Sequence, residues 1–196
     1  MEMTLLEDRE LVERAREGDR TAFQALIERY KKKIYAVALD MTGDHHNAED
    51  ISQDVFLKAF RSLPGFRGRA SVSTWLYRMT VNVCIDRSRK KAWNAMRPKG
   101  AITDDDIYSQ AHSRNTLSDP EKELEKTLLQ QHIRGALDSL TQRERAVFVL
   151  RHYHAMPLKE IAECLNITVG TVKSTLFRTL KRLQEKLAPY VQEDMI

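Results

Sequence analysis

The sequence predicts an all-α protein: two small helical domains joined by a flexible linker, with a helix-turn-helix in the second domain. Apolar residues recur at three- and four-residue steps in almost every periodic segment, and no stretch alternates as a β-strand would. Glycine and proline are scarce, at 7 and 5 of 196 residues, which suits uninterrupted helices. This length allows one ordinary domain or two small ones, and a break in the periodicity favours two.

The first domain spans residues 1–92, and its clearest helix begins after Gly18 and Asp19, a helix stop followed by an N-cap. Asn47, followed three residues later by Asp50, predicts the start of the next helix. Each helix has one apolar stripe that would face a core. The two stripes consist of Phe23, Leu26, Ile27, Tyr30, Ile34, Ala38 and Met41, and of Ile51, Val55 and Ala59.

The stretch "LPGFRGRAS" at residues 63–71 contains a proline and two glycines and is predicted to be a loop. Ser73 is then the expected N-cap of a further helix. At 3.6 residues per turn, one side of that helix is core and the other is free for function. The core side holds Leu76, Met79, Thr80, Val83 and Cys84, and the free side holds Trp75, Arg78, Asn82, Asp86 and Arg89.

Helical periodicity lapses between Trp93 and Ser118, so residues 93–118 are predicted to be a linker, flexible or ordered only against a partner. Three consecutive aspartates at 104–106 give this segment an acidic tract. Fully extended, a linker of this length spans roughly 85 Å. The two domains could therefore occupy separated sites at the same time.

The second domain, residues 119–196, opens with Asp119 and Pro120, an N-cap followed by proline at the first helical position. Thr141 and Glu144 form a capping-box pattern for a later helix. The helix between them presents one apolar side, made of Leu129, Ile133, Ala136, Leu137 and Leu140.

The stretch "LKEIAECLNITVGTVKSTLFRTLKRL" at residues 158–183 predicts a helix-turn-helix. Asn166 can adopt the left-handed conformation that ends the first helix, and Thr168 would cap the second. We expect the second helix to bury Val169, Val172, Leu176 and Leu180. Its outward face then carries residue types that contact phosphates and base edges, namely Thr171, Lys173, Ser174, Thr175, Phe177, Arg178, Lys181 and Arg182.

The formal net charge of +4 and the pI of about 9.1 suit a polyanionic partner. No window approaches the ~20 apolar residues of a membrane span, and the charged N-terminus is not a signal peptide. Cys84 and Cys164 form no CxxC pair and are expected to be buried thiols in a reducing, cytoplasmic setting. His152 and His154 are expected to be exposed at a helix end, and neither a metal nor a cofactor is predicted.

Four stretches in this order resemble the extracytoplasmic-function (ECF) sigma factors, the small two-domain initiation subunits of bacterial RNA polymerase. They are "FQALIERYKKKIYAVA" (23–38), "AEDISQDVFLKAF" (48–60), "FRGRASVSTWLYRMTVNVCIDRSRK" (66–90) and the helix-turn-helix. The resemblance implies that the first domain binds the clamp of core RNA polymerase and captures the −10 promoter element. It implies that the second domain binds the −35 element, and that an anti-sigma factor regulates the chain without direct membrane insertion.

The resemblance and the residue chemistry together give a set of expected site residues. Asp50, Gln53 and Asp54 are assigned to the polymerase clamp. An Asn amide can both donate and accept at the edge of an unstacked base, which places the base pocket at Asn82 with the loop "FRGRAS" as its wall. The remaining single-strand contacts are expected at Phe66, Arg67, Trp75, Arg78, Arg87, Arg89, Lys90 and Lys91.

Two other functions compete with this one. The stretch "DHHNAEDISQD" at residues 44–54 is rich in His and acidic residues, as a divalent-metal nuclease site would be, but its acidic residues fan over more than one helix face. A free-standing helix-turn-helix regulator would bind duplex DNA alone, usually as a dimer on a palindrome. The sequence shows no dimerisation heptad, and such a regulator does not need the single-strand surface of the first domain.

Overall fold

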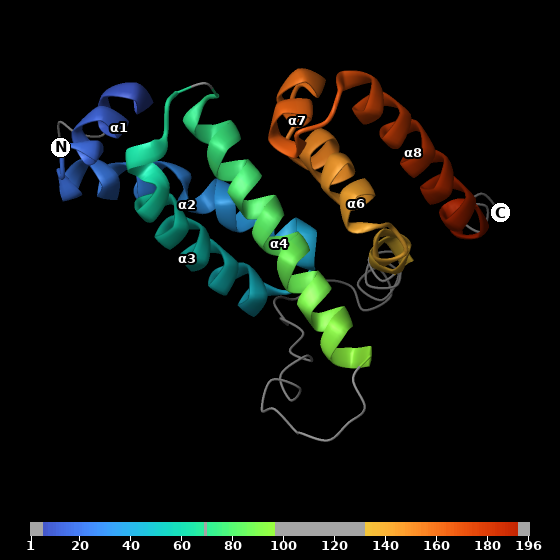
Figure 1. The fold of residues 1–196 in the computed structure, drawn as a ribbon. Helices are drawn as coiled ribbons and strands as arrows, with labels where there is room; N and C mark the ends of the chain where they lie inside the picture. Colours follow the sequence, from blue (N-terminus) through green and yellow to red (C-terminus); the bar gives the residue numbers. More distant parts are fainter. Residues whose placement is uncertain (1–5, 69, 97–131, 192–196) are drawn as a thin grey trace, which may run out of the picture.

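The computed structural model describes residues 6–68, 70–96 and 132–191, and every regular element within these ranges is helical (Figure 1). The predicted linker therefore lies outside the described residues from 97 onward, as do the acidic tract at 104–106 and the predicted cap at Asp119. The elements are α1 (Asp8–Arg16), α2 (Arg20–Thr42), α3 (His45–Ser62), the 3-10 turn η2 (Leu63–Gly65), α4 (Val72–Met96), a helical stretch at 132–138, α6 (Gln142–Phe148), the π-helical turn η4 (Val149–Tyr153), α7 (Leu158–Leu165) and α8 (Val169–Val191).

The predicted start of α2 is confirmed, because the Asp19 side chain accepts hydrogen bonds from the backbone N–H groups of Thr21 and Ala22 at 2.8 and 3.2 Å. The predicted start of α3 is wrong by three residues. Its cap is Asp44, which accepts from the N–H of Asn47 at 2.7 Å. An N-cap side chain accepts from an N–H two or three residues later, so the helix begins before Asn47.

The cap of α4 is likewise Ser71 and not Ser73. The Ser71 hydroxyl accepts from the Thr74 N–H at 3.1 Å, and α4 begins at Val72. At its other end the helix continues to Met96, past the boundary predicted at residue 92. A helix of 25 residues is about 37 Å long at 1.5 Å per residue.

The core of the first domain lies between α2, α3 and α4, with α1 packed on α2. The predicted stripe of α3 is confirmed, because Ile51, Val55 and Ala59 are fully buried. The stripe of α2 is confirmed from Leu26 to Met41 except at Ile27, which, like Phe23, is only partly buried. The core side of α4 is confirmed too. However, α4 has a second buried side, where Thr74 and Val81 are 1% and 0% exposed.

In the second domain the capping box of α6 is confirmed, with Thr141 and Glu144 bonded reciprocally. Asn166 ends α7 in the left-handed conformation, at φ 53° and ψ 51°, as predicted. Thr168 caps α8 by accepting from the Thr171 N–H at 3.1 Å.

The predicted buried side of α8 is wrong in part, because Val169 and Leu180 are 37% and 40% exposed. The helix is turned so that threonines replace them in the core. Its buried residues are Val172, Thr175, Leu176, Thr179 and Leu183. Thr175, expected on the outward face, is therefore unavailable to DNA in this conformation.

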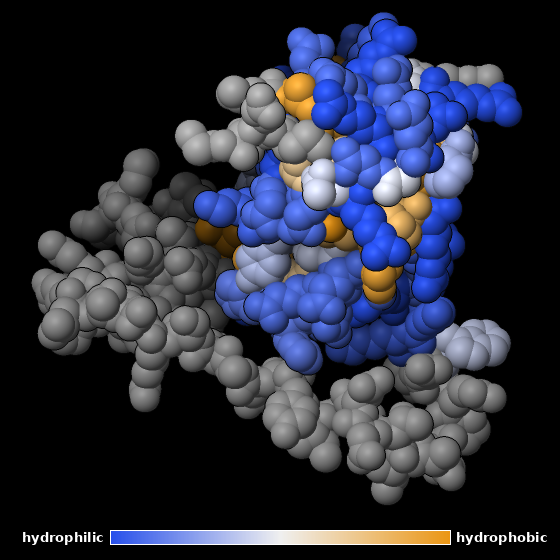
Figure 2. Space-filling view, turned by 90° about the vertical axis from the view of Figure 1, so that its left-hand side faces the viewer, coloured by the Kyte–Doolittle hydropathy of each residue, from blue (hydrophilic) through white to orange (hydrophobic). Residues whose placement is uncertain are grey.

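The two domains pack against each other (Figure 1), with α4 against α7 and α6 and with η4 against α2. One continuous apolar cluster includes core residues of both domains, among them Val81 and Cys84 of α4 and Ile161 and Cys164 of α7. Seen from the side of the first domain, the surface is mostly hydrophilic with scattered apolar side chains (Figure 2). None of the described helices is long and apolar enough to cross a membrane.

Candidate functional site

The acidic residues expected at the polymerase clamp lie side by side on α3 and share one basic partner within the chain. Arg87 of α4 places Nη2 2.7 Å from Asp54 Oδ2 and Nη1 3.6 Å from Asp50 Oδ2. Gln53, between them in sequence, is exposed. Arg87 thus offsets the repulsion of two like charges four residues apart.

This placement separates Arg87 from the other expected strand contacts. Its guanidinium is directed to α3, whereas Asn82 and Arg89 are exposed on a different side of α4. Asn82 and Arg89 are seven residues apart, which is two helical turns, so their side chains project from the same face. Asn82 and Arg89 therefore share one exposed strip of α4 with the carboxylate of Asp86, which lies between them, and Lys90 projects about 80° further round the helix from Asn82.

Trp75 lies at the N-terminal end of this strip and is partly buried against the loop. Its ring centroid is 4.6 Å from that of Phe66, with the ring planes tilted by 37°. Such an aromatic pair stabilises the loop and α4 against each other. Trp75 is half-buried and comes seven residues before Asn82, so it projects from the same face of α4.

Arg78 does not extend into solvent as the sequence analysis expected. Its Nη2 donates to the backbone carbonyl of Glu163 in α7, and its Nε is buried with no hydrogen-bond partner in the described part of the chain. In this conformation the second domain holds Arg78, so the residue is withdrawn from the exposed strip.

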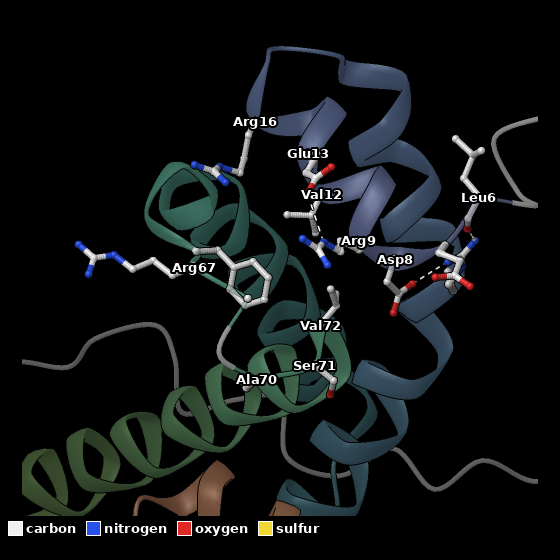
Figure 3. Close-up of a pocket in the computed structure, with 14 residues that line it drawn as sticks. Leu6, Asp8, Arg9, Val12, Glu13, Arg16, Arg67, Ala70, Ser71 and Val72 are labelled. Atoms are coloured by element: carbon white, nitrogen blue, oxygen red, sulfur yellow. Dashed lines mark hydrogen bonds and ion pairs between the residues drawn. The ribbon is translucent and has the colours of Figure 1, made fainter.

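A cavity of about 1050 Å³ lies where α1 approaches the loop after η2 (Figure 3). Phe66, Gly68 and Ser71 of the predicted wall loop line it, together with α1 residues, but Asn82 does not. Its charged lining is mixed, since Arg9 and Arg16 alternate with Asp8 and Glu13. Cations and carboxylates nearly balance in this lining, which makes it a weak site for a phosphate, and Arg67 points away from α1 (Figure 3).

The outward face of α8 carries the expected recognition residues. Lys173, Phe177, Arg178 and Lys181 are exposed, with Phe177 72% exposed. Two smaller polar groups are engaged locally. The Thr171 hydroxyl lies 2.9 Å from that of Thr168, and the Ser174 hydroxyl donates to the Thr171 carbonyl at 3.1 Å.

Arg182 is exposed on this face as well, but it is paired within the domain. Its Nη1 donates to Glu144 Oε2 at 2.9 Å. Burial alone would raise the pKa of Glu144, but hydrogen bonds from the Thr141 N–H and hydroxyl, with the nearby positive charges of Arg182 and Arg178, hold it below its ordinary value. This carboxylate therefore joins the capping box to α8.

The two cysteines are buried, as predicted, and burial raises the pKa of each thiol to about 12. Thiols with such a pKa are almost entirely protonated at neutral pH and react slowly. Among the residues that the structure describes, no group of three or more His, Cys, Asp or Glu side chains gathers as a metal site would require. In the stretch proposed for a nuclease, His45 instead bonds the Tyr35 hydroxyl through Nδ1 at 2.6 Å.

The sequence analysis missed the contact between the domains. Its signal was present in α4, where Thr74, Tyr77, Arg78 and Val81 follow the i, i+3, i+4, i+7 spacing of a second stripe. The polar members of this stripe concealed it. The prediction that His154 is exposed is also wrong. Its side chain is 12% exposed, and its Nε2 lies 2.9 Å from Asp40 Oδ2.

Comparison with known proteins supports this division of the chain. Residues 26–94 match the family model described as Sigma-70 region 2, and residues 136–185 match Sigma-70, region 4. These two ranges contain α3 and α4 on one side and the helix-turn-helix on the other.

Relatives extend the match to nearly the full chain. The chain is 34% identical over 178 residues to the ECF RNA polymerase sigma factor SigW of Bacillus subtilis, covering 90% of this chain and 94% of the relative. It is 28% identical over 193 residues to the RNA polymerase sigma-H factor of Pseudomonas aeruginosa, covering 97% and 99%.

Solved structures show the same fold. The structure of CnrH in complex with the cytosolic domain of CnrY aligns with a TM-score of 0.66 and 22% identity, covering 93% of this chain and 97% of that one. The sigma factor RpoE of Bartonella quintana, in complex with the anti-sigma factor NepR, aligns with a TM-score of 0.64 and 23% identity, covering 85% and 96%. The order of the two sigma regions, the helix-turn-helix and the full-length relatives lead to one conclusion: the chain belongs to the ECF family of RNA polymerase sigma factors and functions in transcription initiation.

Proposed function

We propose that this sigma factor binds core RNA polymerase through α3, holds the melted strand of the −10 element on the exposed strip of α4, and reads the −35 element with α8. The observation that carries the proposal is the strip itself, where Asn82 is exposed two turns before Arg89, with Lys90 next to it in sequence. A flipped base needs hydrogen bonds to its edge, and its flanking phosphates need cations. The strip offers both on one rigid helix.

Trp75 extends this surface with an aromatic group on which a base can stack. Phe66 packs on Trp75 from the loop, and we take Arg67, the exposed residue that follows it, as a phosphate contact. Arg78 joins the strand contacts only when the second domain moves away. Arg87 is excluded from the proposed strand contacts because it already bridges two aspartates of α3.

The experiment that tests the strand-binding role is transcription from a promoter library by core polymerase loaded with the Asn82→Ala variant. We expect fewer open complexes, with binding to core polymerase unchanged, because the lost amide acts only on the unpaired strand. Gln24→Ala is the matched control, since Gln24 is an exposed amide on α2. Normal open-complex formation by Asn82→Ala would remove Asn82 from the proposed site.

On α8, we propose that Lys173, Phe177, Arg178 and Lys181 meet the −35 duplex, with Thr171 and Ser174 at its edge. All four long side chains are exposed on the helix that follows the turn, which is the element that enters the major groove in this motif. Arg182 would join them only after leaving Glu144.

On α3, we propose that Asp50, Gln53 and Asp54 meet a basic surface of the polymerase clamp. Replacing Asp54 by Lys should abolish co-purification with core polymerase, because it reverses the charge and also repels Arg87, its present partner at 2.7 Å. Glu17→Lys, at an exposed position after α1, controls for the change in net charge. Unchanged co-purification of Asp54→Lys would refute the clamp assignment.

The remaining expectations also belong to this proposal. We propose a cytoplasmic, non-enzymatic subunit that requires no cofactor, acts on promoter DNA together with core polymerase, and is held inactive by an anti-sigma factor. The last point is supported by the RpoE structure, whose partner is an anti-sigma factor. A gel shift with and without core polymerase separates this role from that of a free-standing regulator, because a sigma factor should need the core enzyme for tight promoter binding.

A further inference from the structure

A second exposed tryptophan lies near the C-terminal end of α4. The linker was predicted to begin at Trp93, but α4 continues to Met96 and includes this residue. In Figure 1 the last turns of α4 extend beyond the ends of α2 and α3. Trp93 is 68% exposed, more than any other large apolar residue described in the first domain.

The helical register places Trp93 on the strip that carries Asn82. At 100° per residue, Trp75 and Trp93 are both turned by about 20° from Asn82 in one direction, and Arg89 by about 20° in the other. The only two tryptophans of the sequence therefore share one face of one helix, before and after Asn82. Trp93 is about 17 Å from Asn82 along the axis, which is close to five stacked nucleotides at about 3.4 Å each.

Two cations flank the indole of Trp93. Arg89 and Lys90 precede it by four and three residues, the spacings at which side chains are neighbours on a helix. Both are exposed, and neither forms an ion pair with another described residue. The nearest carboxylate before them on α4 belongs to Asp86, one turn earlier, and it is not paired with either cation. Their charges are therefore available to an anionic ligand.

An exposed aromatic ring beside cations is the combination that binds single-stranded nucleic acid. The ring stacks on a base, and the cations contact the neighbouring phosphates. The one large apolar residue described as more exposed than Trp93 is Phe177, at 72%. Phe177 lies between Lys173 and Lys181 on the face of α8 proposed for the −35 element. The two most exposed apolar side chains of the described residues are thus both accompanied by cations.

We propose that Trp93 is a second base-stacking residue of the strand-binding strip, and that it stacks on an unpaired base of the strand held at Asn82. The inference rests on the proposed function, because it takes Asn82 as the fixed point of that strand. The strip then runs from Trp75 to Trp93, about 27 Å along one helix. A nucleic acid fits this surface better than an apolar protein partner, which would have to desolvate Arg89 and Lys90 without pairing them.

The test uses core RNA polymerase loaded with the full chain and a forked promoter DNA that is unpaired across the −10 element. Competition anisotropy measures affinity for the intact fork and for forks in which one unpaired nucleotide at a time lacks its base. The variants are Trp93→Ala, Trp93→Phe and a swap that combines Ala92→Trp with Trp93→Ala. The swap keeps the composition and moves the indole by about 100° around the helix. Both positions are exposed, and circular dichroism of the free chains establishes that each variant is folded.

We expect Trp93→Ala and the swap to bind the intact fork roughly tenfold more weakly than the wild type, and Trp93→Phe to keep most of the affinity. Removing one particular base should weaken the wild type by a similar factor. The same removal should leave Trp93→Ala unchanged, because the ring that stacked on that base is already absent.

Wild-type affinity of Trp93→Ala or of the swap would overturn the inference. An equal loss on fully paired promoter DNA, or at every base-free position, would overturn it in favour of a duplex or phosphate contact. Weaker assembly of Trp93→Ala with core polymerase would overturn it in favour of a protein contact. Asn82→Ala on the same forks decides the proposed function separately: a loss with Asn82→Ala but not with Trp93→Ala removes only Trp93, and no loss with Asn82→Ala removes the strand-binding site.

Discussion

The bridge from Arg87 to α3 gives a prediction that separates two roles for one arginine. In Arg87→Met the aliphatic stem stays and the charge is lost. The Nη2–Asp54 contact at 2.7 Å joins side chains that are 35% and 45% exposed, and such a pair contributes about 0.2–1 kcal/mol. Removing it also exposes the i, i+4 repulsion of Asp50 and Asp54, about 0.2–0.5 kcal/mol. We therefore expect a loss of about 1 kcal/mol in the free energy of unfolding.

Urea denaturation measures this loss. For a slope of about 1–3 kcal/mol/M, the midpoint should fall by about 0.5 M. A double-mutant cycle with Asp54→Asn should show that the two losses are not additive. The alternative, that Arg87 contacts a phosphate, is tested by measuring the affinity of the holoenzyme for single-stranded DNA at several salt concentrations. Loss of one phosphate contact lowers the slope of log K against log salt concentration by ~0.7. A reduced slope with unchanged stability would show that Arg87 contacts DNA after all and would refute the bridge.

Three further changes probe the second domain. Thr179 is fully buried and its hydroxyl has no partner among the described residues, so Thr179→Val should raise the free energy of unfolding by about 1 kcal/mol; a loss measured by urea denaturation would mean that the hydroxyl is satisfied. The Glu144 carboxylate stabilises the fold above its ordinary pKa of 4.5, and this contribution is lost as the pH falls through the lower pKa of the folded state. The melting temperature of Glu144→Gln should therefore be below that of the wild type at neutral pH, and the two temperatures should converge in acid. A difference that stays the same at every pH would contradict the role of this carboxylate. Arg178→Ala should weaken −35 binding by roughly 1–3 kcal/mol if Arg178 reads a base, measured by competition among −35 sequences; an equal loss on every sequence would make it a phosphate contact.

Much of the local structure could be predicted because helix ends depend on near neighbours. Asp19, Asn166 and the Thr141–Glu144 capping box act within three residues of themselves, and all were confirmed. The caps at Asp44 and Ser71 were missed because a second plausible capping residue follows each one closely. Sequence alone does not decide which of two polar residues, two or three positions apart, accepts the capping hydrogen bond from the first turn of the helix.

Tertiary contacts explain the remaining differences. Two different faces of α8 carry residues at three- and four-residue spacing, and either could be the buried one. The face that is buried contains Thr175 and Thr179, and Leu180 is exposed. Hydropathy favours leucine over threonine, so the sequence pointed to the other face. The second buried side of α4 and the contact of His154 with Asp40 depend on the other domain. Neither can be seen from one helix at a time.

The unbroken length of α4 makes it a molecular ruler. Seven residues separate Asn82 from Arg89, which at 1.5 Å per residue is about 10 Å of helix axis, close to three stacked nucleotides at about 3.4 Å each. A single inserted residue between these positions would rotate the cations by about 100° around the helix axis relative to Asn82. They would then no longer face the phosphates of a strand whose base is bound at Asn82. This part of the gene should therefore reject insertions and deletions that a surface loop would accept, whatever their effect on folding.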